Sequence, residues 1–383
     1  MGNTENMDHL SSALSLADDL LTNGVPDRIA GLFGKVPRHL FLPDLLWTED
    51  RRRLDRATEP DEWWDAVYSD QALVTQRDDG RPNGPGVPTS SSSAPTMMAR
   101  MLMAAVCEPG RHVLEIGTGT GFNAALLSEV VGDDHVTSVE IDPGLAGVAR
   151  AALREAGYAP GVITGDGEAD LPDGAFDRLI ATCTFSRIPG AWRRRLVDGG
   201  RVVAPWAPDP GLPGGALAVL DAVAPGVLEG RFEGTLSFMW ARGQRYVSGP
   251  APDPEATPDR AESRDADPRE PLLEGETTVL LSLLVPQWRM GMHVEPGAVE
   301  SYLWVASTGC GSWARLYGDG RVEQSGSRLL VDEFDAALGR WRSWGEPGVE
   351  RFGLTVDARS GLHRLWHETP DRLLWSLPHP PEA

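Results

Sequence analysis

Three glycines at a predicted strand-to-helix turn are the residues best suited to hold a ligand. Gly117, Gly119 and Gly121 lie in HVLEIGTGTGFNAALL, after an apolar stretch typical of a strand and before a helical pattern. Because glycine has no Cβ, a turn of this kind lets backbone N–H groups come close to a bound molecule. The turn alone is compatible with a dinucleotide, with S-adenosylmethionine or with no ligand.

Carboxylates around the turn favour one of these ligands. Glu140 follows Gly121 by 19 residues at the end of the next predicted strand, where it can accept hydrogen bonds from a ribose diol. A dinucleotide requires the spacing G-x-G-x-x-G, whereas this turn is G-x-G-x-G, and Glu115, two residues before it, would repel a pyrophosphate. Glu115 suits the ammonium and sulfonium groups of S-adenosylmethionine instead. Asp166, in GDGE, either accepts from an adenine amino group or is an ordinary turn residue. We expect S-adenosyl-L-methionine as the cofactor.

The composition limits the possible partners. The formal charge of −21 disfavours nucleic acid, whose affinity comes mainly from Lys and Arg on phosphates. The three cysteines, Cys107, Cys183 and Cys310, are far apart and odd in number, which predicts neither a disulfide framework nor a metal site. The first residues carry acids where a signal peptide needs basic ones, and no apolar run reaches membrane-spanning length. We expect a cytoplasmic protein without membrane contact.

The order of hydrophobic patterns predicts an α/β fold. Helical periodicity covers residues 11–33, a long polar loop covers 76–96, and a helix begins at Pro95. From Val113 onward apolar runs alternate with helical patterns, which indicates a parallel sheet covered on both faces. Residues 215–223 and 234–241 follow without a helix between them, as an antiparallel pair at the sheet edge would.

The remaining chain is predicted to form a linker and a second domain. Residues 248–271 have almost no apolar side chains and cannot form a core. After them, residues 277–288 have the pattern of a strand and residues 331–345 that of a helix. The tryptophans of this part either fill a small α+β core or line a peptide-docking surface. We predict an N-terminal region with helices and a substrate loop at residues 1–96 and a cofactor domain at 97–245. An acidic linker follows at 246–272 and an accessory domain at 273–383.

Several segments together resemble the protein-L-isoaspartate O-methyltransferase family. They occur in that family's order between Leu20 and Gly243: VPRHLFLP, VYSDQAL, SSSSAPTMMARML, HVLEIGTGTGFNAALL, VTSVEID, VITGDG, AFDRLIATC and IPGAWRRRLVDGGRVVAPW. The methyltransferase motifs are shared by many families, whereas VPRHLF with the Ser-x-Pro loop is far more specific. The resemblance implies a Rossmann-like class I methyltransferase sheet, preceded by a helical segment and followed here by the smaller α+β domain.

The resemblance also implies roles for individual residues. Ser93 is similar to the family's active-site serine, which contacts the carboxylate that is methylated, although a serine here could instead cap the helix that follows. Ser91 and Ser92 of the same loop, and Tyr68 of VYSDQAL, are implied to bind substrate. The implied cofactor-binding residues are Glu115, Gly117, Thr118, Gly119, Gly121, Glu140, Asp166, Gly167 and Thr182.

The chemistry of such an enzyme needs few polar groups. A carboxylate with an ordinary pKa is already ionised at neutral pH, so its attack on a sulfonium methyl requires no general base. Alignment and exclusion of water are required instead. The methyl ester is an activated acyl group, and the next backbone nitrogen can attack it to give a succinimide that opens to aspartate or isoaspartate.

Three functions remain open from the sequence. The acidic linker, the added domain and the long loop before Ser93 resemble the longer homologues that act on ribosomally made, modified peptides. The first hypothesis is therefore a peptide-tailoring methyltransferase that esterifies one Asp of a cyclised precursor peptide. The second is general repair of isoaspartate, with an unrelated C-terminal addition. The third is a non-catalytic binding module, which the intact Glu115, Glu140 and Asp166 disfavour.

Overall fold

The computed structural model describes residues 2–245, 251–294 and 301–377, with side chains from Leu10 onward. These residues form two compact units. The first contains the chain up to Cys183 together with Pro189–Ala204 and Val219–Leu228. The second contains Thr184–Ile188, Pro205–Ala218 and the chain from Glu229 onward. These boundaries differ from the predicted cut at 245/246, because segments of the predicted cofactor domain belong to the second unit.

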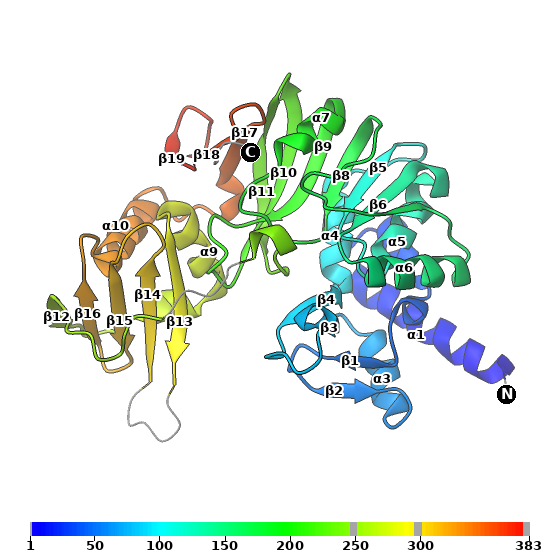
Figure 1. Cartoon of the computed structure of the whole chain (residues 1–383), viewed down its shortest axis with the longest axis horizontal. Coiled ribbons are helices and arrows are strands. Elements are labelled where there is room, and N and C mark those ends of the chain that lie inside the picture. The colour runs from blue at the N-terminus through cyan, green and yellow to red at the C-terminus, as the bar shows by residue number, and fades with distance from the viewer. Residues whose placement is uncertain (1, 246–250, 295–300, 378–383) are drawn as a thin grey trace. The chain divides into compact units, whose positions relative to one another are not determined.

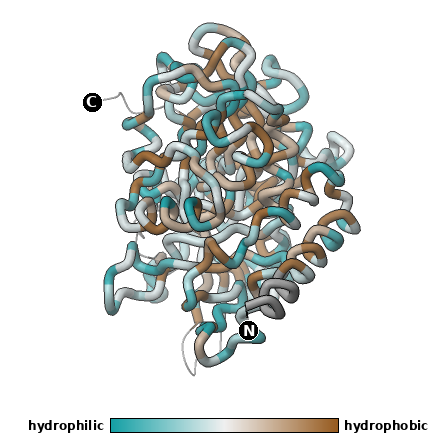
Figure 2. Tube along the Cα trace, turned by 90° about the vertical axis from the view of Figure 1, so that its right-hand side faces the viewer, coloured by the Kyte–Doolittle hydropathy of each residue, from teal (hydrophilic) through white to brown (hydrophobic). Residues whose placement is uncertain are grey.

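Helices form the N-terminal part, as predicted. They are α1 (Gly2–Thr22), α2 (Asp27–Lys35), the 3-10 turn η1 (Arg38–Phe41), α3 (Pro60–Val67) and α4 (Pro95–Ala105). The buried residues of α1 recur at helical spacing: Ala13, Leu16, Ala17 and Leu20. Figure 2 shows the corresponding alternation of hydrophobic and hydrophilic colour along this helix. Pro37, immediately before η1, prevents α2 from continuing.

A small four-stranded sheet holds the predicted substrate loop. Its strands are β1 (Leu45–Trp47), β2 (Arg53–Asp55), β3 (Leu73–Arg77) and β4 (Pro88–Ser92), in the order β2-β1-β3-β4. The prediction of a continuous loop over 76–96 is wrong, since β3 and β4 form an antiparallel pair across it, with the short turn η2 (Asp78–Gly80) between them. The Asp78 carboxylate orders the hairpin by accepting hydrogen bonds from Gly86 N and Val87 N, both at 2.8 Å.

The predicted alternation of strands and helices is confirmed in the main sheet (Figure 1). Its parallel strands are β5 (Val113–Ile116), β6 (Val136–Glu140), β7 (Gly161–Thr164), β8 (Phe176–Ala181) and β9 (Leu196–Trp206). The connecting elements are α5 (Phe122–Val131), η3 (Asp133–His135), α6 (Pro143–Glu155) and α7 (Gly190–Arg195). The strand order is β7-β6-β5-β8-β9, so strands are added on one side of β5 first and then on its other side. Ligands of such sheets bind beyond the carboxyl ends of the strands where this order reverses.

The main sheet continues further than the sequence suggested. β10 (Gly215–Ala224) and β11 (Val227–Leu236) are neighbours, and the predicted second strand over 234–241 overlaps β11 only at residues 234–236. The prediction that this pair forms the sheet edge is wrong. β17 (Phe352–Asp357) lies beside β11, and β18 (Leu362–His367) and β19 (Leu373–Leu377) follow it. The turns η4 (Arg242–Gln244) and η5 (Val349–Arg351) complete this part. The last strands of the predicted accessory domain are therefore part of the main sheet.

An additional antiparallel sheet confirms a further C-terminal layer. Its strands, in the order β12-β16-β15-β14-β13, are β12 (Arg260–Ser263), β13 (Trp288–His293), β14 (Tyr302–Ser307), β15 (Trp313–Tyr317) and β16 (Arg321–Ser325). The helices of this part are α8 (Glu270–Leu273), α9 (Gly275–Leu284) and α10 (Leu330–Ser343).

Two predictions fail in this part for physical reasons. Residues 275–284 form α9 rather than a strand, because a run that is apolar all round is equally compatible with a buried helix. The predicted linker contains β12 and the start of α8, because β12 pairs with β16 through its backbone and Leu272 of α8 is buried. Ion pairs accompany this pairing: Arg260 lies 2.9 Å from Asp332, and Arg264 lies 2.8 Å from Asp335.

Candidate functional site

The glycine turn joins β5 to α5 at the carboxyl end of the sheet. Gly117 has a φ of +92° and Gly121, the N-cap residue of α5, has a φ of +90°. A Cβ built on Gly117 would lie 2.7 Å from the Thr182 Oγ1 atom, and the N-cap glycine of α5 has no side chain, so the Phe122 N–H donates instead to Thr120 Oγ1 at 3.4 Å. The N–H groups of Gly117, Gly119 and Gly121 are bonded to Val139, Glu140 and Thr118, so these glycines offer close approach to the backbone rather than free N–H donors. Ligand binding at this turn stays a prediction.

Glu115 lies beneath this turn. Its side chain has no exposed surface; Oε1 accepts a hydrogen bond from Asn123 Nδ2 at 2.7 Å, and Oε2 accepts one from the Ser138 hydroxyl. The Thr118 hydroxyl lies 2.5 Å from the same Ser138 oxygen. Burial raises the pKa of Glu115 to about 7, and the neighbouring Glu140 acts in the same direction. Glu115 thus supports the turn from below, and its predicted contact with the cofactor stays a prediction.

Glu140 ends β6 beside the turn, where the sequence placed it. Its Oε2 accepts from Gly119 N at 2.8 Å and its Oε1 from Asp142 N at 2.9 Å. Each carboxylate oxygen has more than one lone pair, so the group can accept further hydrogen bonds from a diol. The carboxylate is thereby fixed in position by the backbone of the turn.

The predicted residues after β7 and β8 lie at the same end of the sheet. Thr182 Oγ1 donates to the Gly117 carbonyl at 2.6 Å. Gly167 is packed so closely that a Cβ on it would lie 2.4 Å from Ile116 Cγ2, and its carbonyl accepts from Trp192 Nε1 at 2.8 Å. Asp166 is half-buried, and its Oδ1 accepts from Glu168 N within its own turn. The structure therefore brings together the carboxyl ends of β5, β6, β7 and β8 with their predicted residues.

The serine segment at the end of β4 lies against the middle glycine. A Cβ built on Gly119 would lie 3.6 Å from the Ser91 carbonyl oxygen. Ser92 is buried, whereas Ser93 is half-buried and its hydroxyl has no hydrogen bond to any residue that the structure describes. The alternative role of Ser93 as a helix cap is not observed, because the N-cap residue of α4 is Ala94 and the Thr96 N–H in its first turn donates to Asp70 rather than to Ser93. The Ser93 hydroxyl is left available to a substrate.

Tyr68 is more enclosed than its predicted substrate role requires. Its side chain is buried, stacks on Trp64, and its hydroxyl lies 2.6 Å from His39 Nδ1. Burial raises the pKa of Tyr68 to about 12, so the phenol stays protonated at neutral pH. A contact of Tyr68 with substrate stays a prediction.

A second connection ties the β3–β4 hairpin to the cofactor side. Gln76 Nε2 donates to Asp142 Oδ2 at 3.3 Å, and Thr89 Oγ1 donates to Gln76 Oε1 at 2.8 Å. The other Asp142 oxygen caps α6 by accepting from Gly144 N at 2.8 Å. The hairpin carrying the serines is thus held to the segment that follows Glu140.

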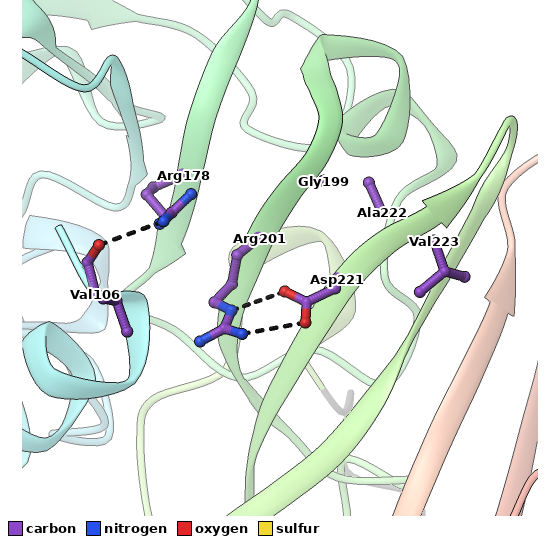
Figure 3. A pocket seen from close by; sticks show the side chains of 7 residues that line it. All are labelled: Val106, Arg178, Gly199, Arg201, Asp221, Ala222 and Val223. Atoms are coloured by element: carbon purple, nitrogen blue, oxygen red, sulfur yellow. Dashed lines mark hydrogen bonds and ion pairs between the residues drawn. The ribbon is translucent and has the colours of Figure 1, made fainter. Parts of the chain in front are cut away.

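The pocket in Figure 3 lies elsewhere on the sheet. Its arginines are near the amino end of β8 and in β9, and their guanidinium groups are already bonded: Arg201 pairs with both oxygens of Asp221, and Arg178 donates to Ala105 and Val106 carbonyls. These bonds give the pocket a structural role rather than a place in the site.

Metal-binding clusters and membrane-spanning helices are both absent from the residues that the structure describes. Across 2–245, 251–294 and 301–377, no three His, Cys, Asp or Glu side chains are grouped to hold a metal ion. Within the same ranges, no helix combines the length and the apolar character that crossing a bilayer needs.

Comparison with known proteins decides the family. The family model described as Protein-L-isoaspartate(D-aspartate) O-methyltransferase matches residues 14–210, which include both the serine segment and the glycine turn. This chain belongs to that family. Members are S-adenosylmethionine-dependent carboxyl O-methyltransferases, so the chain is an enzyme of this kind with S-adenosyl-L-methionine as its cofactor.

Proteins named protein-L-isoaspartate O-methyltransferase in several organisms are similar to this chain. A protein-L-isoaspartate O-methyltransferase of Ignicoccus hospitalis is 35% identical over 201 residues, covering 51% of this chain and 82% of its own length. One from Methylorubrum populi is 31% identical, covering 61% of this chain and 95% of its own length. A solved protein-L-isoaspartate O-methyltransferase has a TM-score of 0.54 at 22% identity, and the likeness in fold covers 93% of this chain and all of that one.

The residues of the methyltransferase fit the cofactor. Only a glycine fits beside the Thr182 hydroxyl at Gly117, Glu140 offers acceptors for a diol, and the carboxyl groups of Glu140 and Glu115 lie beside and beneath the turn. This donor set suits a ligand with hydroxyl groups and positive charge. When bound, the cofactor supplies the methyl group, and the residues of the chain orient it.

Sequence reasoning missed one residue of the site. Arg38, in VPRHLF, is completely buried and bonds to the serine segment. The only available signal was its place in the motif, because an arginine in the sequence gives no indication of burial.

Proposed function

We propose that the enzyme methylates the carboxylate of isoaspartyl residues in peptides and proteins, in the manner of a general repair enzyme. The observation that carries the proposal is the Ser93 hydroxyl, which lies on the segment packed against the glycine turn and has no partner among the described residues. The family match that spans both segments, and the names of the relatives, support the same substrate.

The geometry suits methylation of a carboxylate. The Ser93 O–H can donate to one carboxylate oxygen, while the other oxygen attacks the methyl carbon and the carbon–sulfur bond breaks. The products are the methyl ester and S-adenosylhomocysteine. Since the carboxylate is ionised at neutral pH, no proton has to be removed, and the residues around it need only align it and exclude water.

The ester then reacts without the enzyme. The nitrogen of the following residue attacks the ester carbonyl, methanol leaves, and a succinimide forms. Its hydrolysis returns aspartate or isoaspartate, so repeated cycles restore normal aspartate.

A peptide-tailoring role is the second candidate. It is supported by the part of the chain beyond residue 210, which the family model does not match. However, the solved protein-L-isoaspartate O-methyltransferase resembles 93% of this chain in fold, so the extra sheet is no longer an argument for tailoring. The names of the relatives also favour general isoaspartate methylation.

Mass spectrometry of matched peptides tests the proposal. One linear peptide is made with isoaspartate and an identical one with aspartate, and a cyclised Asp-containing peptide is the third substrate. We expect the gain of one methyl group, or loss of water after imide formation, on the isoaspartyl peptide alone. Methylation confined to the cyclised peptide would refute general repair and support tailoring, and binding of S-adenosylmethionine without methylation of any peptide would refute both.

A further inference from the structure

The arginine of VPRHLF lies at the centre of the substrate side. Arg38 begins η1 and has no exposed surface. Neither the predicted cofactor residues nor the predicted substrate residues include it. Its contacts show what the motif does in this fold.

The Arg38 guanidinium binds two separate segments of backbone. On one side, Nη1 donates to the Val67 and Ser69 carbonyls at 2.9 and 3.0 Å, and Nη2 donates to the Gln71 carbonyl at 3.0 Å. These acceptors belong to the end of α3 and the turn after it. That turn leads directly into β3, the partner strand of β4.

On the other side, the same group binds the serine segment. Nη2 donates to the Ser93 carbonyl at 3.1 Å and to the Ser92 carbonyl at 3.4 Å, and Nε donates to the Ser92 hydroxyl at 3.3 Å. All three guanidinium nitrogens therefore donate hydrogen bonds, and their acceptors lie in residues 67–71 and in Ser92 and Ser93. The planar fork of an arginine can hold such a set in one geometry, whereas a lysine ammonium cannot.

The charge of Arg38 is balanced by no direct ion pair within the described residues. Burial lowers the pKa of Arg38 to about 10, and Asp70 partly opposes this effect. The group is still a cation at neutral pH. Asp70 itself accepts from Thr96 N at 2.8 Å and from the Thr96 hydroxyl at 2.5 Å, in the first turn of α4. Burying a cation costs folding free energy, which hydrogen bonds to carbonyl groups offset only in part. This cost is consistent with a role of Arg38 beyond packing.

Arg38 also reaches the cofactor side. Its guanidinium carbon lies 5.9 Å from the centre of the Phe122 ring, and Phe122 is the first residue of α5 after Gly121. Phe41 of η1 packs on the same ring with centroids 5.7 Å apart. One side chain thus contacts both the backbone of Ser93 and the start of the helix that follows the glycine turn.

We infer that Arg38 is a positioning residue that fixes the Ser92–Ser93 backbone relative to the start of α5, and so aligns the substrate carboxylate with the methyl group. The inference rests on the proposed function, since it assigns Ser93 to the substrate carboxylate. Misplacement of a reacting group by about 1 Å can cost about 100-fold in rate. Loss of Arg38 should therefore weaken catalysis far more than cofactor binding.

Three variants and a control test the inference kinetically. Arg38→Met removes the fork and the charge, Arg38→Lys keeps only the charge, and Ser92→Ala removes one hydrogen bond without changing the arginine. The matched control is Arg154→Met, an exposed arginine on α6. Cofactor affinity and the number of binding-competent sites are measured by calorimetry, and kcat and KM for the isoaspartyl peptide are expressed per competent site.

The expected pattern separates positioning from folding. Arg38→Met should lower kcat/KM by about 100-fold and Ser92→Ala by about 3- to 10-fold, while the dissociation constant of S-adenosylmethionine changes less than about threefold. Arg38→Lys should recover little of the loss. Unchanged kinetic constants per competent site in Arg38→Met would show a purely structural role and overturn the inference, as would an equal loss of cofactor affinity.

Hydrogen–deuterium exchange tests the positioning role of Arg38 separately from the proposed function. If the unaltered enzyme does not methylate isoaspartyl peptides, the proposed function falls, but Arg38→Lys or Ser92→Ala must still raise amide exchange at residues 88–96 and not at 117–123. If these variants raise amide exchange equally at residues 88–96 and 117–123, or at neither segment, the positioning role is refuted even in a fully active enzyme.

Discussion

The proton on Glu115 gives the sharpest test of the site. This carboxyl has no exposed surface, and burial raises its pKa from an ordinary value of 4.5 to about 7. In the unfolded chain the group loses its proton near pH 4.5, whereas in the folded protein it keeps the proton until about pH 7. The unfolded state therefore binds fewer protons between these values, and the free energy of unfolding must fall as pH rises through this window.

The size of the effect follows from the two pKa values. Their difference corresponds to about 3 kcal/mol, of which about 2 kcal/mol lies between pH 5.5 and pH 8.5. Glu115→Gln keeps an acceptor for Asn123 or Ser138 but cannot ionise. The variant should thus lose this contribution to the pH dependence while other groups titrate as before. The difference in free energy of unfolding, variant minus unaltered protein, should therefore rise by about 2 kcal/mol from pH 5.5 to pH 8.5.

Urea denaturation of both proteins across this pH range, without cofactor, measures the difference. The comparison between the two proteins cancels the titration of all other groups. Parallel pH profiles would show that folded Glu115 is ionised throughout, and the account of a protonated carboxyl under the glycine turn would then be wrong.

Three further substitutions test individual contacts. Ser93→Ala should lower kcat by about tenfold without changing the dissociation constant of the cofactor, because a single hydrogen bond to the substrate is lost; parallel losses in kinetics and calorimetry would assign Ser93 to loop shape alone. Glu140→Ala should raise the dissociation constant of S-adenosylmethionine by about 10- to 100-fold in calorimetry, while the exposed Glu155→Ala on α6 should leave it unchanged. Gly117→Ala should destabilise the protein by at least about 1–2 kcal/mol in urea, since its φ is +92° and its new Cβ would lie 2.7 Å from Thr182 Oγ1, which must shift. Gly147→Ala, in α6 with nothing within 4 Å of the new Cβ, should stabilise it by about 0.5–1 kcal/mol, and similar effects of the two glycine variants would contradict the strain argument.

The cofactor side could be predicted because its signals are local in the sequence. The spacing of Gly117, Gly119 and Gly121 and the place of Glu140 at the end of a strand follow from short stretches of chain. The structure places Glu140 on the turn as expected. The complete burial of Glu115 beneath the turn could not be predicted, because spacing along a strand does not show which face is covered, and its contact with the cofactor stays a prediction.

The substrate side and the C-terminal part depend on contacts between distant segments. Nothing in VPRHLF shows that Arg38 binds carbonyls of 67–71 and of Ser92 and Ser93 at once. The pairing of β17 with β11 joins segments separated by a second sheet, which no local pattern encodes. The misassignment of α9 has another cause, since its buried run lacks the polar face that identifies a surface helix.

The position of β17 beside β11 has a consequence for the integrity of the enzyme. β11 ends before the acidic segment that looked like a natural place to divide the chain. A chain cut there would leave a ten-residue strand with a free row of N–H and C=O groups, which is a template for self-association. β17, β18 and β19 cover this long strand and leave the five-residue β19 at the end of the sheet instead, so the C-terminal part cannot be treated as a detachable module.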